Sequence, residues 1–244
     1  NPDTMAANAR RAALLGAPAI DLNFGCPAKT VNKNMGGSIL LRHPDRIHQI
    51  VSAVREAVPA GTPVTAKMRL GFEDNSLTLE NALAMQEGGA SSLCIHARTK
   101  VDGYKPPAYW PEIAKLKQHI DIPIIANGEV WTPEDYLLCQ EQSQCPDIMI
   151  GRGAIRRPDL ALRIKAMQNN QQLTQMDWQG IINMVLNYID IIRNSGKEKF
   201  VVARIKQWLS FISLAYEEAI PLFSQIKRML SVEEIENRIK AEVK

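Results

Sequence analysis

The sequence predicts an α/β fold in which a TIM barrel, a (β/α)8 barrel, is followed by an all-α helical domain. Short β-branched apolar runs alternate with helical patterns up to about residue 170, and the strand signal then disappears. Such alternation is typical of βαβ units and a parallel sheet. The composition is that of a globular protein rather than a disordered one, because 45% of the residues are hydrophobic and the net charge is only +3.

Five short, mostly apolar runs predict the strands of the sheet. They span residues 19–24, 63–69, 92–96, 122–126 and 147–151. Parallel strands that are covered on both faces carry such near-continuous apolar runs. No run approaches the roughly 20 apolar residues that a membrane-spanning helix needs, so we expect no membrane partner.

Helical patterns separate these runs and then take over the chain. Between the strands we expect helices over residues 4–15, 44–57, 76–86, 110–118 and 132–142. After the last strand we expect helices over residues 176–193, 199–216, 220–230 and 231–243. Their starts carry capping signals, such as Thr132 before Pro133 and the capping box that runs from Ser231 to Glu234.

Polar groups at the end of every predicted strand favour a barrel over an open sheet. A barrel builds its site from all of its βα loops, whereas a doubly wound sheet concentrates its site at one switch point. Five units can be counted where a barrel has eight, so we expect the barrel to be N-terminally incomplete in this chain, with about three further units before it. Residues 1–170 are predicted to form the barrel portion and residues 171–244 the helical domain.

Cys26 is the first candidate for chemistry, because it follows a strand between Gly25 and Pro27 in a loop with little steric cover. A lone cysteine is more often a buried structural residue. The nearby Asn23 and the pair Gly36 and Gly37 favour a functional role, since glycine lets a backbone approach a ligand closely. The other three cysteines lack such a setting, and none of the four forms a CxxC pair, so we expect no metal site.

Two pairs of basic residues have the same spacing on neighbouring predicted strands. Lys67 and Arg69 are two residues apart and so point to one face, and His96 and Arg98 repeat the pattern. Surface placement is the simpler explanation, but the flanking residues look buried. Because an unpaired buried cation is prohibitively costly, we expect an anionic or electron-rich ligand here.

Glycines after the last two strands predict a phosphate site. Gly151 and Arg152 offer backbone N–H groups and a guanidinium to an anion. Together with Asn127 and Gly128 they match the place where barrels often bind phosphate. This combination suggests flavin mononucleotide (FMN) as the cofactor.

At this point the motifs resemble, in order and spacing, those of the tRNA-dihydrouridine synthases. The matching segments are residues 21–27, 67–71, 96–99, 126–128 and 149–153. Residues 129–131 and 203–209 look most like the bacterial C subfamily, which acts on uridine 16 of the D-loop. The resemblance implies NADPH-dependent reduction of the uracil C5–C6 bond through FMN, in the cytoplasm.

The resemblance also implies a role for each site residue. Cys26 would protonate the uracil C5, and Lys67 and His96 would contact the flavin ring. The residues implied for the ribityl phosphate are Asn127, Gly128, Glu129, Gly151 and Arg152, and those implied for orienting the flipped uracil are Asn23, Arg69 and Arg98.

The helical domain is expected to bind tRNA through Arg204, Lys206, Gln207 and Arg228. A solvated charged face is the alternative for these residues. Two other functions stay open, namely an FMN barrel oxidoreductase that acts on a small pyrimidine, like dihydroorotate dehydrogenase, and a non-catalytic truncated RNA-binding fragment. We expect a monomer.

Overall fold

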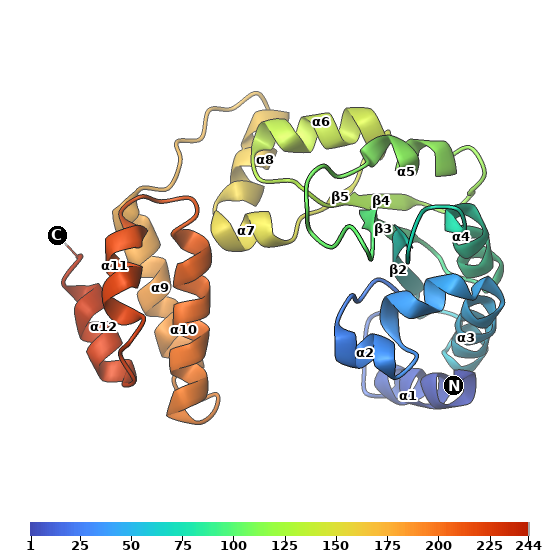
Figure 1. Ribbon diagram of the computed structural model, residues 1–244, viewed down its shortest axis with the longest axis horizontal. Coiled ribbons are helices and arrows are strands. Elements are labelled where there is room, and N and C mark those ends of the chain that lie inside the picture. Colours follow the sequence, from blue (N-terminus) through green and yellow to red (C-terminus); the bar gives the residue numbers. More distant parts are fainter. Residues whose placement is uncertain (244) are drawn as a thin grey trace. The chain divides into compact units, whose positions relative to one another are not determined.

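The computed structural model describes residues 1–243, which form two compact units (Figure 1). The first unit holds Asn1–Val130 and Glu134–Ile150, and the second holds Trp131–Pro133 and the chain from Gly151 onward. Within residues 1–243, no helix has the length and apolar character that crossing a membrane requires.

The first unit is built on a five-stranded parallel sheet whose strands lie side by side in chain order. The strands are β1 (Ile20–Asn23), β2 (Val64–Gly71), β3 (Leu93–Thr99), β4 (Ile124–Asn127) and β5 (Ile148–Met149). All five predicted strands are confirmed, although β5 is shorter than predicted. The order contains no reversal, so this sheet has no switch point of the kind that defines a doubly wound fold.

The two faces of this sheet differ sharply in polarity. Cross-strand register pairs Asn23 with Lys67, Arg69 with His96, and His96 with Asn127. Since side chains alternate along a strand, these polar residues share one face, on which Asn23 is exposed and Lys67 is half-buried. The opposite face is apolar and buried, with Leu22, Ala66, Met68, Ile95 and Ala126 all at most 5% exposed.

Helices cover the apolar face. The connecting helices are α1 (Pro2–Leu14), α3 (Pro44–Ala57), α4 (Thr78–Glu87), α5 (Trp110–Leu116) and α6 (Pro133–Ser143), and they follow one side of the curving sheet in Figure 1. Each predicted helix is confirmed to within a few residues. In α3, for example, the buried residues Ile47, Ile50, Val51 and Val54 form the i, i+3, i+4, i+7 stripe of an amphipathic helix.

Four short helices lie where the sequence analysis predicted none. They are α2 (Lys29–Lys33), the 3-10 helix η1 (Gly37–Arg42), α7 (Arg152–Arg156) and α8 (Leu160–Gln168). Helices α2, η1 and α7 have only five or six residues, too few to display a helical period, whereas α8 has nine residues and lies in the segment where the strand signal ends. The η1 helix matters for the site, because it covers the loop that carries Cys26.

The second unit contains the four predicted C-terminal helices. They are α9 (Trp178–Ile192), α10 (Glu198–Ile212), α11 (Ala219–Ile226) and α12 (Val232–Lys240). Their apolar faces form one core that includes Ile182, Ile205, Leu209 and Ile235. Ser231 is confirmed as the N-cap of α12, because its Oγ accepts a hydrogen bond from the Glu233 amide, while the reciprocal bond of a capping box from Glu234 stays a prediction.

The second unit begins earlier in the chain than the predicted helical domain. Helices α7 and α8 belong to it, and α7 packs on α10. The predicted division of function at residues 170 and 171 therefore stays a prediction, while the compact units divide after Ile150.

Candidate functional site

The carboxyl ends of the first four strands bring most of the predicted site residues to one edge of the sheet. Asn23 ends β1 and Cys26 follows in the next loop, while Lys67 and Arg69 lie near the end of β2. His96 and Arg98 lie near the end of β3 and Asn127 ends β4, with Gly128 and Glu129 directly after it. Because parallel strands end on the same edge, this clustering follows from the topology.

The loop of Cys26 is fixed by its own backbone. The Cys26 carbonyl accepts hydrogen bonds from Asn32 Nδ2 (2.9 Å), Ser38 Oγ (2.9 Å) and the Ser38 amide (3.1 Å). Upstream, Asn23 Oδ1 accepts a hydrogen bond from the Gly25 amide at 2.9 Å. Hydrogen bonds therefore fix the backbone at Cys26 and just before it, while Cys26 itself remains partly exposed.

The sequence analysis expected the glycine pair to allow close approach of a ligand, but Gly37 allows close approach of another part of the chain. Its φ is +64°, and a Cβ there would lie 2.7 Å from the Cys26 carbonyl oxygen and 2.9 Å from the Cys26 Cβ. The close approach is therefore to Cys26 itself, so Gly37 serves to pack η1 against the candidate catalytic loop.

Lys67 is a half-buried cation that donates a hydrogen bond to a neutral amide. Its Nζ donates to Asn127 Oδ1 at 3.0 Å, and Asn127 Nδ2 donates to the Met149 carbonyl at 2.8 Å. No carboxylate of residues 1–243 lies within ion-pair distance of Lys67. Burial lowers the pKa of Lys67, which is the effect expected of a desolvated ammonium.

Arg69 is buried and connects two loops of the site. Its Nε donates to the Gly25 carbonyl at 3.0 Å, and one terminal nitrogen donates to the carbonyls of Thr99 and Gly103, both at 2.9 Å. Burial also lowers the pKa of Arg69. The guanidinium therefore links the loop after β1 to the loop after β3, whatever it also does for a ligand.

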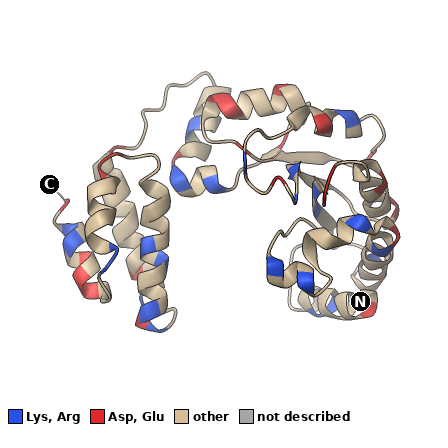
Figure 2. Ribbon diagram, viewed as in Figure 1, with Lys and Arg blue, Asp and Glu red and all other residues tan. Residues whose placement is uncertain are grey.

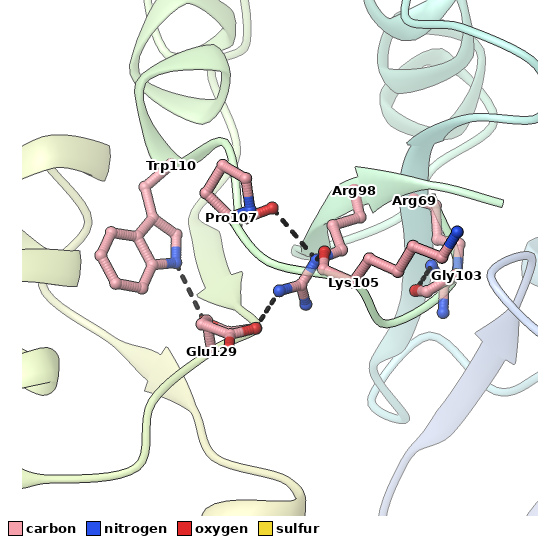
Figure 3. Close-up of polar contacts among 8 residues, drawn as sticks. Arg69, Arg98, Gly103, Lys105, Pro107, Trp110 and Glu129 are labelled. Carbon is pink, nitrogen blue, oxygen red and sulfur yellow. Dashed lines mark hydrogen bonds and ion pairs between the residues drawn. The ribbon is translucent and has the colours of Figure 1, made fainter. Parts of the chain in front are cut away.

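Arg98 forms a second buried link, between the ends of β3 and β4 (Figure 3). Its side chain is fully buried and ion-pairs with Glu129, while its Nε donates to the Lys105 carbonyl at 2.6 Å. Glu129 has a φ of +62°. Beside it, Trp110 Nε1 donates to the Gly128 carbonyl at 2.9 Å.

Tyr104 is a site residue that the sequence analysis missed. Its ring lies 6.2 Å from that of His96, edge to face, and the Arg69 guanidinium lies 5.2 Å from its centre. Tyr104 follows β3 in a turn that Asp102 organises by accepting hydrogen bonds from the Thr99 amide and hydroxyl. Only the turn residues, Asp102 and Gly103, could have signalled it.

The remaining cysteines are buried and inert. Burial raises the pKa of Cys94 to about 11 and that of Cys139 to about 12, and it also raises the pKa of Cys145. These three thiols are structural, as the sequence analysis expected. Among residues 1–243, no group of three or more His, Cys, Asp or Glu side chains could hold a metal ion.

The other predicted residues belong to the second unit. Gly151 precedes α7, and the Arg152 guanidinium lies 5.1 Å from the centre of the Trp131 ring. Arg204 and Gln207 are exposed on α10, and Arg228 is exposed after α11. Lys206 donates to the carbonyls of Lys227 and Met229, so its ammonium closes the end of α11.

Comparison with known proteins decides the family. Residues 1–241 match the family model of the dihydrouridine synthases, called Dihydrouridine synthase (Dus). The chain belongs to the dihydrouridine synthase family. Members of this family are flavin-dependent oxidoreductases that reduce uridines of tRNA, and this chain is an enzyme of that class.

Several relatives share nearly the whole of the chain. A tRNA-dihydrouridine(16) synthase of Shewanella oneidensis is 49% identical over 96% of this chain and 73% of its own length. One of Aquipseudomonas alcaligenes is 47% identical over 97% of this chain and 75% of its own. One of Neisseria meningitidis is 43% identical over 98% and 72%. Membership in the family therefore extends over both units.

Proposed function

We propose that this dihydrouridine synthase reduces the C5–C6 double bond of uridine 16 in the D-loop of tRNA, with FMN as its cofactor and NADPH as its electron donor. The position rests on the names of relatives that are 43–49% identical to this chain. The observation that carries the chemistry is the half-buried Lys67 on the polar face of the sheet, which forms no ion pair with any carboxylate of residues 1–243.

The polar face supports a barrel fold for the first unit. An open sheet with helices on both faces has two apolar faces. Here only one face is apolar and covered, while Asn23, Lys67, His96 and Asn127 share the other. We propose that the five strands form part of a (β/α)8 barrel that closes around this polar face.

Lys67 and His96 fit a flavin ring by their chemistry. A desolvated ammonium that bonds only to a neutral amide favours an electron-rich neighbour, because such a neighbour offsets the cost of its burial. When bound, FMN would supply the hydride that reduces uracil C6. Lys67 would stabilise negative charge at the edge of the ring, and Asn127 holds Lys67 in place.

Because the Glu129 carboxylate in the loop after β4 pairs with Arg98, we propose that this loop meets a phosphate through its backbone. Gly128 has a φ of +116°, and a Cβ there would lie 3.1 Å from the His96 ring. Asn127 and Gly128 would hold the ribityl phosphate, and Glu129 would act by fixing the loop through its ion pair with Arg98. The roles of Gly151 and Arg152 toward the same phosphate stay predictions from the family resemblance.

Cys26 is the proposed acid that protonates the uracil C5. A thiol is mostly protonated at neutral pH and is a competent proton donor. The fixed backbone of its loop would keep the sulfur at one position. Asn23 and Arg69 border this loop, and we propose that with Arg98 they orient the uracil, either directly or by holding the loops that contact it.

The helices of residues 171–244 are the proposed tRNA-binding domain. Helix α10, within this range, carries the basic residues Lys199, Arg204 and Lys206 and a single acidic residue, Glu198, and Figure 2 shows the charged residues along it. Arg204, Gln207 and Arg228 are exposed and free to meet phosphates, which fix register without reading sequence. We further propose a monomer that works in the cytoplasm, where tRNA is processed.

The test is reduction of defined tRNA by the purified full chain. Incubated with FMN, NADPH and an unmodified tRNA transcript, the protein should form dihydrouridine at position 16, detected by mass mapping of the D-loop. A transcript with cytidine at position 16 is the control and should stay unreduced. Reduction of a free pyrimidine in preference to tRNA would instead identify a small-molecule oxidoreductase.

A further inference from the structure

The second unit contains a surface pocket between helices α7, α9 and α10. Its volume is about 330 Å³, and its lining consists of Ile155, Tyr188, Arg204, Gln207, Trp208 and Phe211. Three of these six residues are aromatic, and the one charged residue among them is a cation. None of the residues proposed to act on the flavin or the uracil lines this pocket.

Two contacts hold the aromatic rings of this pocket in place. Trp208 Nε1 donates to the Ile155 carbonyl at 3.0 Å, which holds the indole on α10 against α7. The Tyr188 ring meets the Trp208 ring edge to face, with centres 4.8 Å apart and planes at 75°. Rings fixed in this way can receive a flat group without the entropic cost of ordering them first.

The polar residues of the pocket suit the edge of a nucleobase. Arg204 and Gln207 are three positions apart on α10 and so lie on the same side of the helix. An amide offers both a donor and an acceptor to a base edge, and a planar guanidinium can stack on a base or bond to a phosphate. Among the described residues, no Asp or Glu lines the pocket, so its lining does not repel a polyanion.

We propose that this pocket binds one unstacked nucleobase of the tRNA, away from the uridine that is reduced. The proposal rests on the proposed function, because it takes tRNA as the partner. A volume near the lower end of ligand-binding cavities matches a single base rather than a larger ligand. Stacking on aromatic rings is the common way in which proteins hold single-stranded bases.

The test combines pocket variants with tRNA that lacks one base at a time. Tyr188→Leu should weaken tRNA binding about tenfold, while Tyr188→Phe, which keeps the ring, should bind like the wild type. Gln207→Ala, at an exposed position that does not endanger folding, should weaken binding by a smaller factor. Because stacking releases no counterions, the slope of log Kd against log salt should not change in Tyr188→Leu.

The abasic series identifies the base. Among transcripts with single abasic sites at unpaired positions, one should bind the wild type about tenfold more weakly and should lose nothing further with Tyr188→Leu. If both pocket variants bind every transcript like the wild type, or if the loss adds fully at every abasic position, the inference is wrong while the proposed function stands. Absence of tRNA binding by the wild type would overturn the proposed function itself.

Discussion

At the scale of single residues, the loop after β1 is held rigidly at its backbone and left open at one side chain. Its carbonyl at Cys26 accepts three hydrogen bonds, whereas the cysteine residue is partly exposed. A proton donor needs this combination, because its position must be fixed and its reactive atom must be reachable.

Replacing the thiol should separate the two halves of the reaction. In Cys26→Ala, uridine reduction should fall by at least about 100-fold, the contribution typical of general acid catalysis, while oxidation of NADPH through bound flavin continues. The measurements are dihydrouridine formation and NADPH consumption on one preparation. A variant that forms dihydrouridine at the wild-type rate would exclude Cys26 as the acid.

Gly37 should be intolerant of even one methyl group. Gly37→Ala combines a left-handed backbone with a Cβ 2.7 Å from the Cys26 carbonyl, so we expect the free energy of unfolding to fall by about 2–4 kcal/mol. Gly16→Ala shares the positive φ but has open space, and should cost only about 1 kcal/mol. Gly61→Ala has neither problem and should be nearly neutral. Urea denaturation of the three variants makes this comparison.

The four thiols should differ in reactivity in the native protein. At pH 8, iodoacetamide should label Cys26 and spare Cys94 and Cys139, whose pKa values of about 11 and about 12 keep them protonated. Since burial raises the pKa of Cys94 from about 9 to about 11, the free energy of unfolding should be unaffected by this thiol at neutral pH and should fall as the pH rises from about 9 to about 11. Peptide mapping of the native protein provides the measurement, and labelling after denaturation is the control. Equal native labelling of all four would contradict the burial described here.

At the scale of elements, buried cations connect the loops and strand ends at the carboxyl edge of the sheet. Arg69 connects the loops after β1 and β3, and Arg98 connects the ends of β3 and β4. Because these contacts join loops rather than strands, we expect them to fix the conformation of the site and to contribute little to formation of the sheet.

The Arg98–Glu129 pair should be far more important than an exposed pair. Glu129→Gln keeps the size of the side chain and removes the charge that pairs with a buried guanidinium, which should cost about 2–4 kcal/mol. Glu73→Gln is the matched control, because its partner Arg42 is exposed and such pairs contribute about 0–1 kcal/mol. The urea unfolding midpoints of the two variants, each compared with the wild type, measure this difference in stability. Equal effects would mean that the Arg98 pair is screened by water.

At the scale of the whole molecule, the chain divides its chemistry between two compact units. The first unit holds Cys26, Lys67 and His96, whereas the basic helices α7 and α10 belong to the second. Each unit has its own core, so a change at the surface of one should leave the local structure of the other intact.

Removing surface charge from the second unit should affect tRNA binding alone. Arg204→Gln with Arg228→Gln should weaken tRNA binding and reduce the salt slope by about 1–2, since each lost phosphate contact removes about 0.9. NADPH oxidation without tRNA should not change. Lys206→Gln is a separate case and should also lower stability, because Lys206 holds two carbonyls at the end of α11. An unaltered salt slope in the double variant would remove these charges from tRNA recognition.

The sequence by itself determined the elements and the identity of the chemistry. Apolar runs located all five strands, and periodic patterns located nine helices to within a few residues. These patterns depend on residues that are close together in the sequence, so they can be recognised without the structure. The motifs around Cys26, Lys67 and Asn127 then pointed to the family, because each motif is also a short contiguous segment.

Only the tertiary structure decided what the site residues do to one another. Glu129 pairs with a guanidinium 31 residues away, Gly37 packs against Cys26, and Tyr104 meets His96 and Arg69. The pocket of Tyr188 and Trp208 exists only because α9 and α10 pack together. Such contacts depend on strand register and on the course of the loops. Both are set by interactions between residues far apart in the sequence, so no short segment of the sequence predicts them.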